Sequence, residues 1–88
     1  MALVDFHDVM EILISASDEK DAQKILDTYS SADGKLKEVE VSLNDQNVQD
    51  IRNNLEILLQ LAKDTKETEL STQAQVLKTS FIKVYLSN

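Results

Sequence analysis

Residues 47–63 read NVQDIRNNLEILLQLAK, and this stretch decides the fold class. Its apolar residues recur at intervals of three and four, which places them on one face of a helix. That face carries Val48, Ile51, Leu55, Leu58, Leu59 and Ala62. Asn44 or Asp45 precedes the stretch at a position suited to an N-terminal cap. The pattern predicts an amphipathic helix that packs against other helices.

Similar spacing occurs on both sides of this stretch. Apolar stripes run through residues 3–14, 22–29 and 70–85, and no internal repeat is evident among them. The 88 residues include no proline and one glycine, so little in the chain forces the backbone out of the helical region. We therefore expect an all-α fold, a compact three- or four-helix bundle with antiparallel neighbours, in which residues 1–88 form a single helical domain.

Residues 29–43 allow two interpretations. Val39, Val41 and Leu43 alternate with polar residues as in a half-buried strand, and Asp33-Gly34 suits the turn of a short hairpin at 29–43. The spacing of Leu36, Val39 and Leu43 also suits a helix. We favour the helix, because a lone hairpin would have no other strand to join. The preceding helix is expected to end near Gly34.

Charge is distributed unevenly along the chain. The net charge is −7, of which residues 1–34 carry −6, whereas residues 70–88 contain Lys78, Lys83 and no acidic side chain. An acidic surface repels phosphate backbones, so we expect no direct nucleic-acid binding. The N-terminus lacks the pattern of a signal peptide, and no stretch has the length and hydropathy of a membrane span. We therefore expect a cytoplasmic protein.

No set of residues predicts a catalytic, cofactor or metal site. Residues 29–40 resemble a degenerate calcium-binding helix-loop-helix with Asp33 and Glu40 as ligands, but a tyrosine occupies the first ligand position. His7 and Glu11 have a spacing that can hold a metal, although one histidine makes a weak site. We expect no enzyme activity, no cofactor and no small-molecule substrate, because no motif places a nucleophile beside the only histidine.

The functional prediction is based on apolar residues that lie outside the main apolar stripes of the helices. Ile57 and Leu61 lie off the main stripe of their helix, as do Val76, Ile82 and Leu86 near the C-terminus. We predict a small protein–protein interaction module, a regulator, adaptor or inhibitor that forms a homodimer or binds a protein partner. The expected partner-binding residues are Ile57, Leu61, Ile82, Tyr85 and Leu86. One alternative is an acidic blocker of a basic partner, similar to immunity proteins or nucleic-acid mimics, in which the charge of residues 1–34 provides the affinity. The other alternative is a calcium sensor that uses the degenerate helix-loop-helix of residues 29–40.

Overall fold

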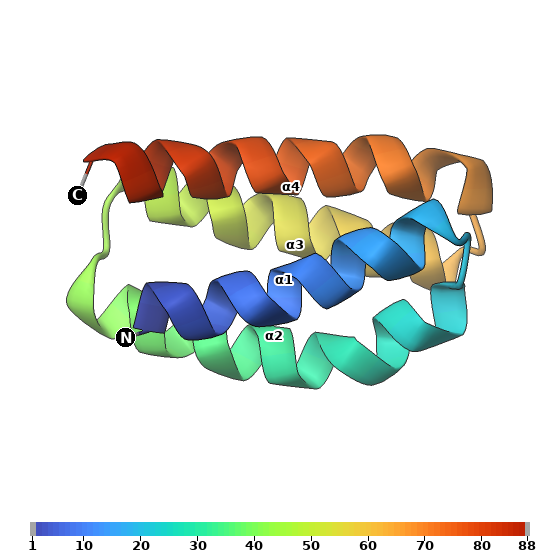
Figure 1. Ribbon diagram of the computed structural model, residues 1–88, viewed down its shortest axis with the longest axis horizontal. Coiled ribbons are helices and arrows are strands. Elements are labelled where there is room, and N and C mark those ends of the chain that lie inside the picture. The colour runs from blue at the N-terminus through green and yellow to red at the C-terminus, as the bar shows by residue number, and fades with distance from the viewer. Residues whose placement is uncertain (1, 88) are drawn as a thin grey trace.

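The apolar stripes form four helices within residues 2–87, the part of the chain that the computed structural model describes. They are α1 (Ala2–Asp18), α2 (Ala22–Ser42), α3 (Gln46–Lys63) and α4 (Glu67–Ser87). Three-residue turns join them, so successive helices are antiparallel, and α4 returns to pack beside α1 (Figure 1). A helix of 21 residues is about 31 Å long, so α2 and α4 both span the 33 Å long axis. The all-α bundle predicted from the sequence is confirmed, and it has four helices.

The core contains one continuous apolar cluster to which every helix contributes. Its largest completely buried side chains include Phe6, Leu36, Leu55 and Leu77, one from each helix. Ser17 and Ser80 are the buried polar residues of the described chain, and each donates its hydroxyl hydrogen bond to a carbonyl oxygen one turn earlier in its own helix. Each buried hydroxyl therefore has a backbone acceptor within its own helix.

The alternative of a hairpin at 29–43 is wrong, because α2 runs unbroken through this segment. Gly34 lies inside the helix with a negative φ, so the helix does not end there either. Ala32, Leu36 and Val39 are buried, and they continue the stripe that begins at Ile25. Burying these side chains outweighs the roughly 1 kcal/mol that an interior glycine costs a helix.

Two of the three turns have the same backbone geometry. At the end of α1, the Asp21 amide donates to the Ala16 carbonyl and the Lys20 amide to the Ser17 carbonyl. The amides of Lys66 and Thr65 form the corresponding pair of bonds at the end of α3. This is the Schellman motif, which requires a left-handed residue. Lys20 and Thr65 supply it with φ of 57° and 53°, so neither turn depends on a glycine.

The hairpins α1–α2 and α3–α4 repeat one pattern of burial at an interval of 45 residues. The matching buried pairs are Leu3/Val48, Phe6/Ile51, Met10/Leu55, Leu13/Leu58, Ser17/Ala62, Ile25/Leu70, Ala32/Leu77, Leu36/Phe81 and Val39/Val84. Lys20 and Thr65, the left-handed turn residues, are also 45 positions apart. The sequence conceals this structural repeat because most paired residues are similar rather than identical. At this interval α1 corresponds to α3 and α2 corresponds to α4. The α1–α4 interface is therefore equivalent to the α2–α3 interface.

Candidate functional site

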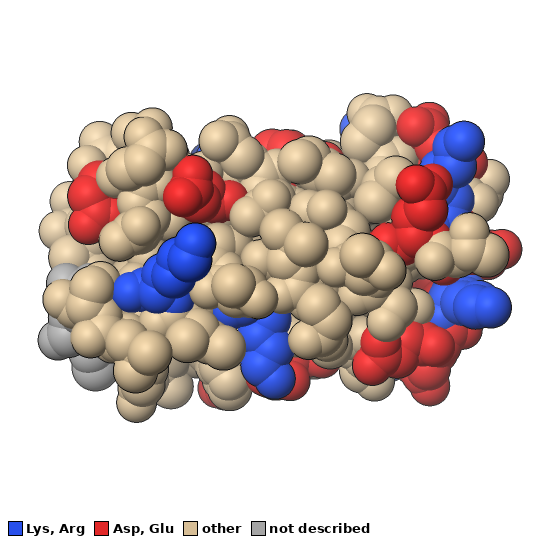
Figure 2. Space-filling model, turned by 90° about the horizontal axis from the view of Figure 1, so that it is seen from above, with Lys and Arg blue, Asp and Glu red and all other residues tan. Residues whose placement is uncertain are grey.

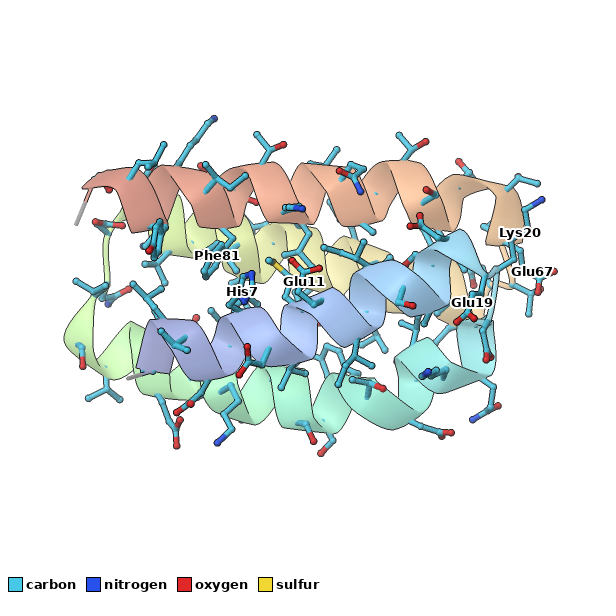
Figure 3. The ribbon with its side chains drawn as sticks, viewed as in Figure 1. His7, Glu11, Glu19, Lys20, Glu67 and Phe81 are labelled. Carbon is cyan, nitrogen blue, oxygen red and sulfur yellow. The ribbon has the colours of Figure 1, made fainter. Side chains whose placement is uncertain are left out.

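The candidate site lies where α1 packs beside α4. On α1, Val4, His7 and Glu11 are spaced by three and four residues, which places them on the side that faces α4. On α4, Lys78, Ile82 and Tyr85 have the same kind of spacing and face α1. In Figure 3, His7 and Glu11 lie on the side of α1 that faces Phe81 of α4. We call this interface the apolar seam.

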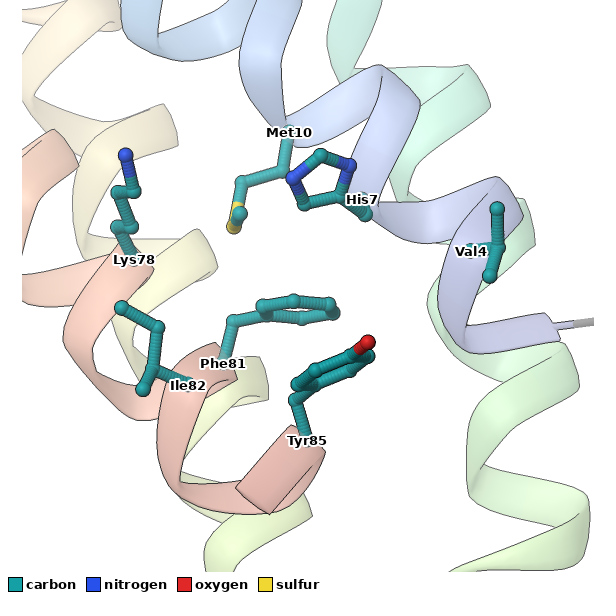
Figure 4. A pocket seen from close by; sticks show the side chains of 7 residues that line it. All are labelled: Val4, His7, Met10, Lys78, Phe81, Ile82 and Tyr85. Atoms are coloured by element: carbon teal, nitrogen blue, oxygen red, sulfur yellow. The ribbon is translucent and has the colours of Figure 1, made fainter. Parts of the chain in front are cut away.

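The apolar seam contains a groove of about 390 Å³. Figure 4 shows the seven lining residues, which are Val4, His7 and Met10 from α1 and Lys78, Phe81, Ile82 and Tyr85 from α4. The Phe81 ring lies 5.4 Å from the His7 ring and 6.1 Å from the rings of Phe6 and Tyr85, measured between centroids. These contacts fix Phe81 between the core and the groove. The groove therefore has a largely apolar lining with aromatic rings at its base.

Charged groups border this lining at one end. His7 Nε2 lies 3.2 Å from Glu11 Oε1, and His7 Nδ1 lies 3.5 Å from Asp8 Oδ1. Lys78 Nζ is 4.0 Å from the same Glu11 oxygen, which is the one ion pair between α1 and α4 that the structure shows in residues 2–87. The acidic groups belong to α1 and the lysine to α4. The rim therefore has opposite charge on its two sides.

The predicted partner-binding residues separate into two groups. Ile82 and Tyr85 line the groove, and Leu86 follows them at the end of α4. Their exposed fractions are 41%, 60% and 76%, which are high for large apolar side chains. Figure 2 shows mainly uncharged side chains over the middle of the face that α4 forms, with charged ones crowded at the end where α4 begins.

Ile57 and Leu61 lie on another part of the surface. They share a side of α3 with Asn54, whose side chain donates a hydrogen bond to Ser80 Oγ on α4. Ile57 is 47% exposed, whereas Leu61 is half-buried and packs against the core. Val76 faces the same α3–α4 side, in a polar groove that also contains Asn53 and Thr79. The predicted partner-binding residues therefore lie on two sides of α4.

The α2–α3 interface has the opposite character, and we call it the charged seam. Arg52 of α3 forms ion pairs with Asp33 and Glu40 of α2 and with Glu56 of its own helix. The Tyr29 hydroxyl donates a 2.6 Å hydrogen bond to Glu56 Oε1. The Arg52 side chain is 21% exposed, and it joins two acids of α2 to its own helix. The sequence analysis missed this network.

The pKa values of the charged seam follow from these contacts. The hydrogen bond that Arg52 donates to Asp33 lowers the pKa of the Asp33 carboxyl, and the hydrogen bonds that it donates to Glu40 raise the already high pKa of the Arg52 guanidinium. Burial, followed by the hydrogen bond to Glu56, raises the pKa of Tyr29 to about 12. The charged forms of Arg52 and Asp33 therefore stabilise each other, and Tyr29 stays protonated well above neutral pH.

The calcium-binding helix-loop-helix considered from the sequence is wrong, because residues 29–40 are part of a continuous helix. Asp33 and Glu40 contact Arg52 instead of converging on a loop. Within residues 2–87, no three histidine or acidic side chains form a group that could hold a metal ion. His7 and Glu11 contact each other as a histidine–carboxylate pair.

Comparisons with protein families, with curated proteins and with solved structures find no match to this chain. Among residues 2–87, no helix combines the length and apolar character needed to cross a membrane. The apolar seam therefore has to be interpreted from its own geometry. Its most informative property is that large apolar side chains remain exposed around a preformed groove.

Proposed function

We propose that this protein is a small protein–protein interaction module that self-associates through the apolar seam. The observation that supports this function is the groove between α1 and α4, where Val4, Ile82 and Tyr85 line the hollow and are all more than 40% exposed. Covering a large aliphatic side chain completely is worth about 1.5–3 kcal/mol. Covering the exposed parts of several neighbouring side chains therefore favours association.

A second copy of the chain suits this face in size. Stable interfaces bury about 800 Å² of each partner, which is about one sixth of the 4876 Å² surface of this molecule. The two longer dimensions of the bundle are 33 and 19 Å, so one side of it has an area of this order. A dimer would also supplement a core that, in a chain of this length, provides only modest stability.

Light scattering coupled to size exclusion, from micromolar to millimolar protein, tests the proposal. We expect the mass to rise toward that of a dimer with concentration, and the paired substitutions Ile82→Asp and Leu86→Asp to abolish this rise. Circular dichroism should show unchanged helix content in the variant, because both side chains are exposed. Val41→Asp is the matched control, since Val41 is 88% exposed on α2 and does not line the groove.

Three outcomes would count against self-association through this face. The first is a wild-type chain that stays monomeric at millimolar concentration. The second is unfolding of the variant that carries Ile82→Asp and Leu86→Asp. The third is a Val41→Asp control that weakens association to the same extent. Added salt also separates this function from the acidic-blocker alternative. Apolar contacts persist in salt, whereas binding through the acids of residues 1–34 weakens steeply.

A further inference from the structure

The charges on the rim of the apolar seam are self-complementary. Asp8 and Glu11 lie on α1, and Lys78 lies across the groove on α4. The Asp8 side chain is 74% exposed, and its ion-pair contact in the described residues is the weak one with His7. The Lys78 side chain is 40% exposed, with its nitrogen 4.0 Å from Glu11. Both groups can therefore accept a closer partner from outside the molecule.

Two arrangements bring two copies together face to face with two-fold symmetry. If the axis is perpendicular to the helices, α1 lies over α1 of the second copy, and the acidic sides meet. If the axis is parallel to the helices and lies above the groove, α1 of each copy lies over α4 of the other. The second arrangement places acidic groups against lysines, and the first places like charges together, which costs affinity.

The positions of the residues along the long axis of the bundle, here called their levels, agree with a two-fold axis parallel to the helices. Contacts place Glu11 level with Lys78 and His7 level with Phe81, one turn further along α4. Asp8 follows His7 on α1 and so falls between these two levels. A parallel two-fold axis does not change the level of any residue. Asp8 therefore arrives opposite the segment between Lys78 and Phe81 of the second copy.

We infer that the partner is a second copy bound about a two-fold axis parallel to the helices, with Asp8 of each copy paired to Lys78 of the other. This inference rests on the proposed function, since it specifies how the self-association occurs. The two equivalent ion pairs lie at the same level on opposite sides of the axis, at one end of an apolar centre formed by Val4, Ile82 and Tyr85 of both copies. The apolar centre supplies most of the affinity, and the ion pairs select the orientation.

A charge-exchange experiment tests the orientation. Asp8→Lys places lysine against lysine at both symmetric positions, and Lys78→Asp places acid against acid. We expect each variant alone to dimerise roughly tenfold more weakly than the wild type. A mixture of the two should regain wild-type affinity as a mixed dimer, because both of its contacts then join opposite charges. The doubly substituted chain should regain it as a homodimer.

Asp5→Lys and Lys83→Asp provide the matched control. They change the net charge by the same amounts on the same two helices, but Asp5 projects away from α4, and Lys83 lies in the groove on the α3 side. We expect neither control variant to show preferential mixed dimers. Thermal melts should show that all four variants are folded, including Lys78→Asp, which puts a second acid beside Glu11.

The possible failures are distinguishable. A wild-type chain that never dimerises overturns the proposed function itself. A wild-type dimer whose single variants associate normally, or whose mixture shows no preference for mixed pairs, overturns only the orientation. Native mass spectrometry of the mixture, with one variant isotopically labelled, counts mixed and homogeneous dimers directly.

Discussion

The apolar seam and the charged seam occupy equivalent places in the bundle but are built from different chemistry. At the interval of 45 residues, His7 and Glu11 on α1 correspond to Arg52 and Glu56 on α3. On the opposing helices, Lys78 and Tyr85 of α4 correspond to Asp33 and Glu40 of α2. In the charged seam, the shared framework therefore places the long cation Arg52 opposite two acids. In the apolar seam, it places the shorter ring of His7 opposite a lysine and a tyrosine.

The two seams therefore differ in how closely ion pairs bridge their helices. Arg52 reaches across to α2 and ties Asp33 and Glu40 to its own helix. His7 is shorter, and its nitrogens face Asp8 and Glu11 on the same helix. The groove over Phe81 lies beside His7. The residues at several equivalent positions of the repeated scaffold, on both facing helices, thus distinguish the two interfaces.

The largest expected effect is the loss of stability caused by a substitution in the apolar seam. Phe81→Ala removes a ring that is 4% exposed and that contacts Phe6, His7 and Tyr85. We expect it to lower the free energy of unfolding by about 3–5 kcal/mol, which is most of the stability of a domain this small. Urea denaturation of dilute, monomeric protein measures the loss.

Phe81→Leu keeps that prediction testable if the alanine variant does not fold. Leucine is the residue that the equivalent position, Leu36, already carries. We expect a much smaller loss, because leucine leaves less empty space beneath the groove. A loss of less than about 1 kcal/mol for Phe81→Ala would show that the aromatic cluster does not hold α1 against α4.

A smaller effect is expected from breaking the charged seam. Arg52→Ala leaves Asp33 and Glu40 partly buried without their cation, and we expect a loss of about 1–3 kcal/mol at neutral pH. His7→Ala is the matched control at the equivalent position. It should cost less, because His7 is 42% exposed and its carboxylate contacts lie on its own helix.

The pH dependence of the same pair identifies the cause. Contact with Arg52 lowers the pKa of Asp33 in the folded state below its ordinary value of 3.8. The stabilisation is therefore complete above about pH 4 and is lost as the pH falls toward the lowered pKa. Urea denaturation at neutral and acidic pH should show a steeper acid loss for the wild type than for Arg52→Ala. Equal slopes would contradict the role assigned to the pair.

The spacing of apolar residues predicted the helices because burial repeats along each helix at a fixed interval. Asp45 was named as an expected cap and does accept a hydrogen bond from the Val48 amide. The spacing also marked Ile82 and Leu86 as lying off the main stripe of α4, and both are exposed. These properties are local, so they can be read from a short stretch of chain.

Contacts between helices were not predictable in the same way. Spacing places Ile57 and Ile82 off their main stripes, but it does not say which neighbour covers each side, so it could not show that they lie on two sides of α4. The charged seam joins Arg52 to residues on another helix, and its one local signal was the pair Arg52 and Glu56, spaced by four. Val4 was not among the predicted partner-binding residues, yet it lines the groove.

The smallest expected effect concerns Gly34, where the two hairpins carry different residues at equivalent positions. The helix crosses this residue with a negative φ, and a Cβ placed on it meets no atom within 4 Å outside the neighbouring backbone of its own helix. Gly34→Ala should therefore stabilise the protein by about 0.5–1 kcal/mol, because alanine loses less backbone freedom on folding. Its counterpart 45 positions later is Thr79, an exposed residue inside α4, so Thr79→Ala is the matched control.

We expect Thr79→Ala to change stability by only a few tenths of a kcal/mol, since threonine already limits the backbone and differs less from alanine in helix propensity. Parallel thermal melts of the two variants measure both changes. A destabilised Gly34→Ala variant would mean that α2 needs its glycine, either for a bend in the helix or for a partner that approaches closely there. In that case the outer surface of α2, and not the α1–α4 face alone, would require a functional explanation.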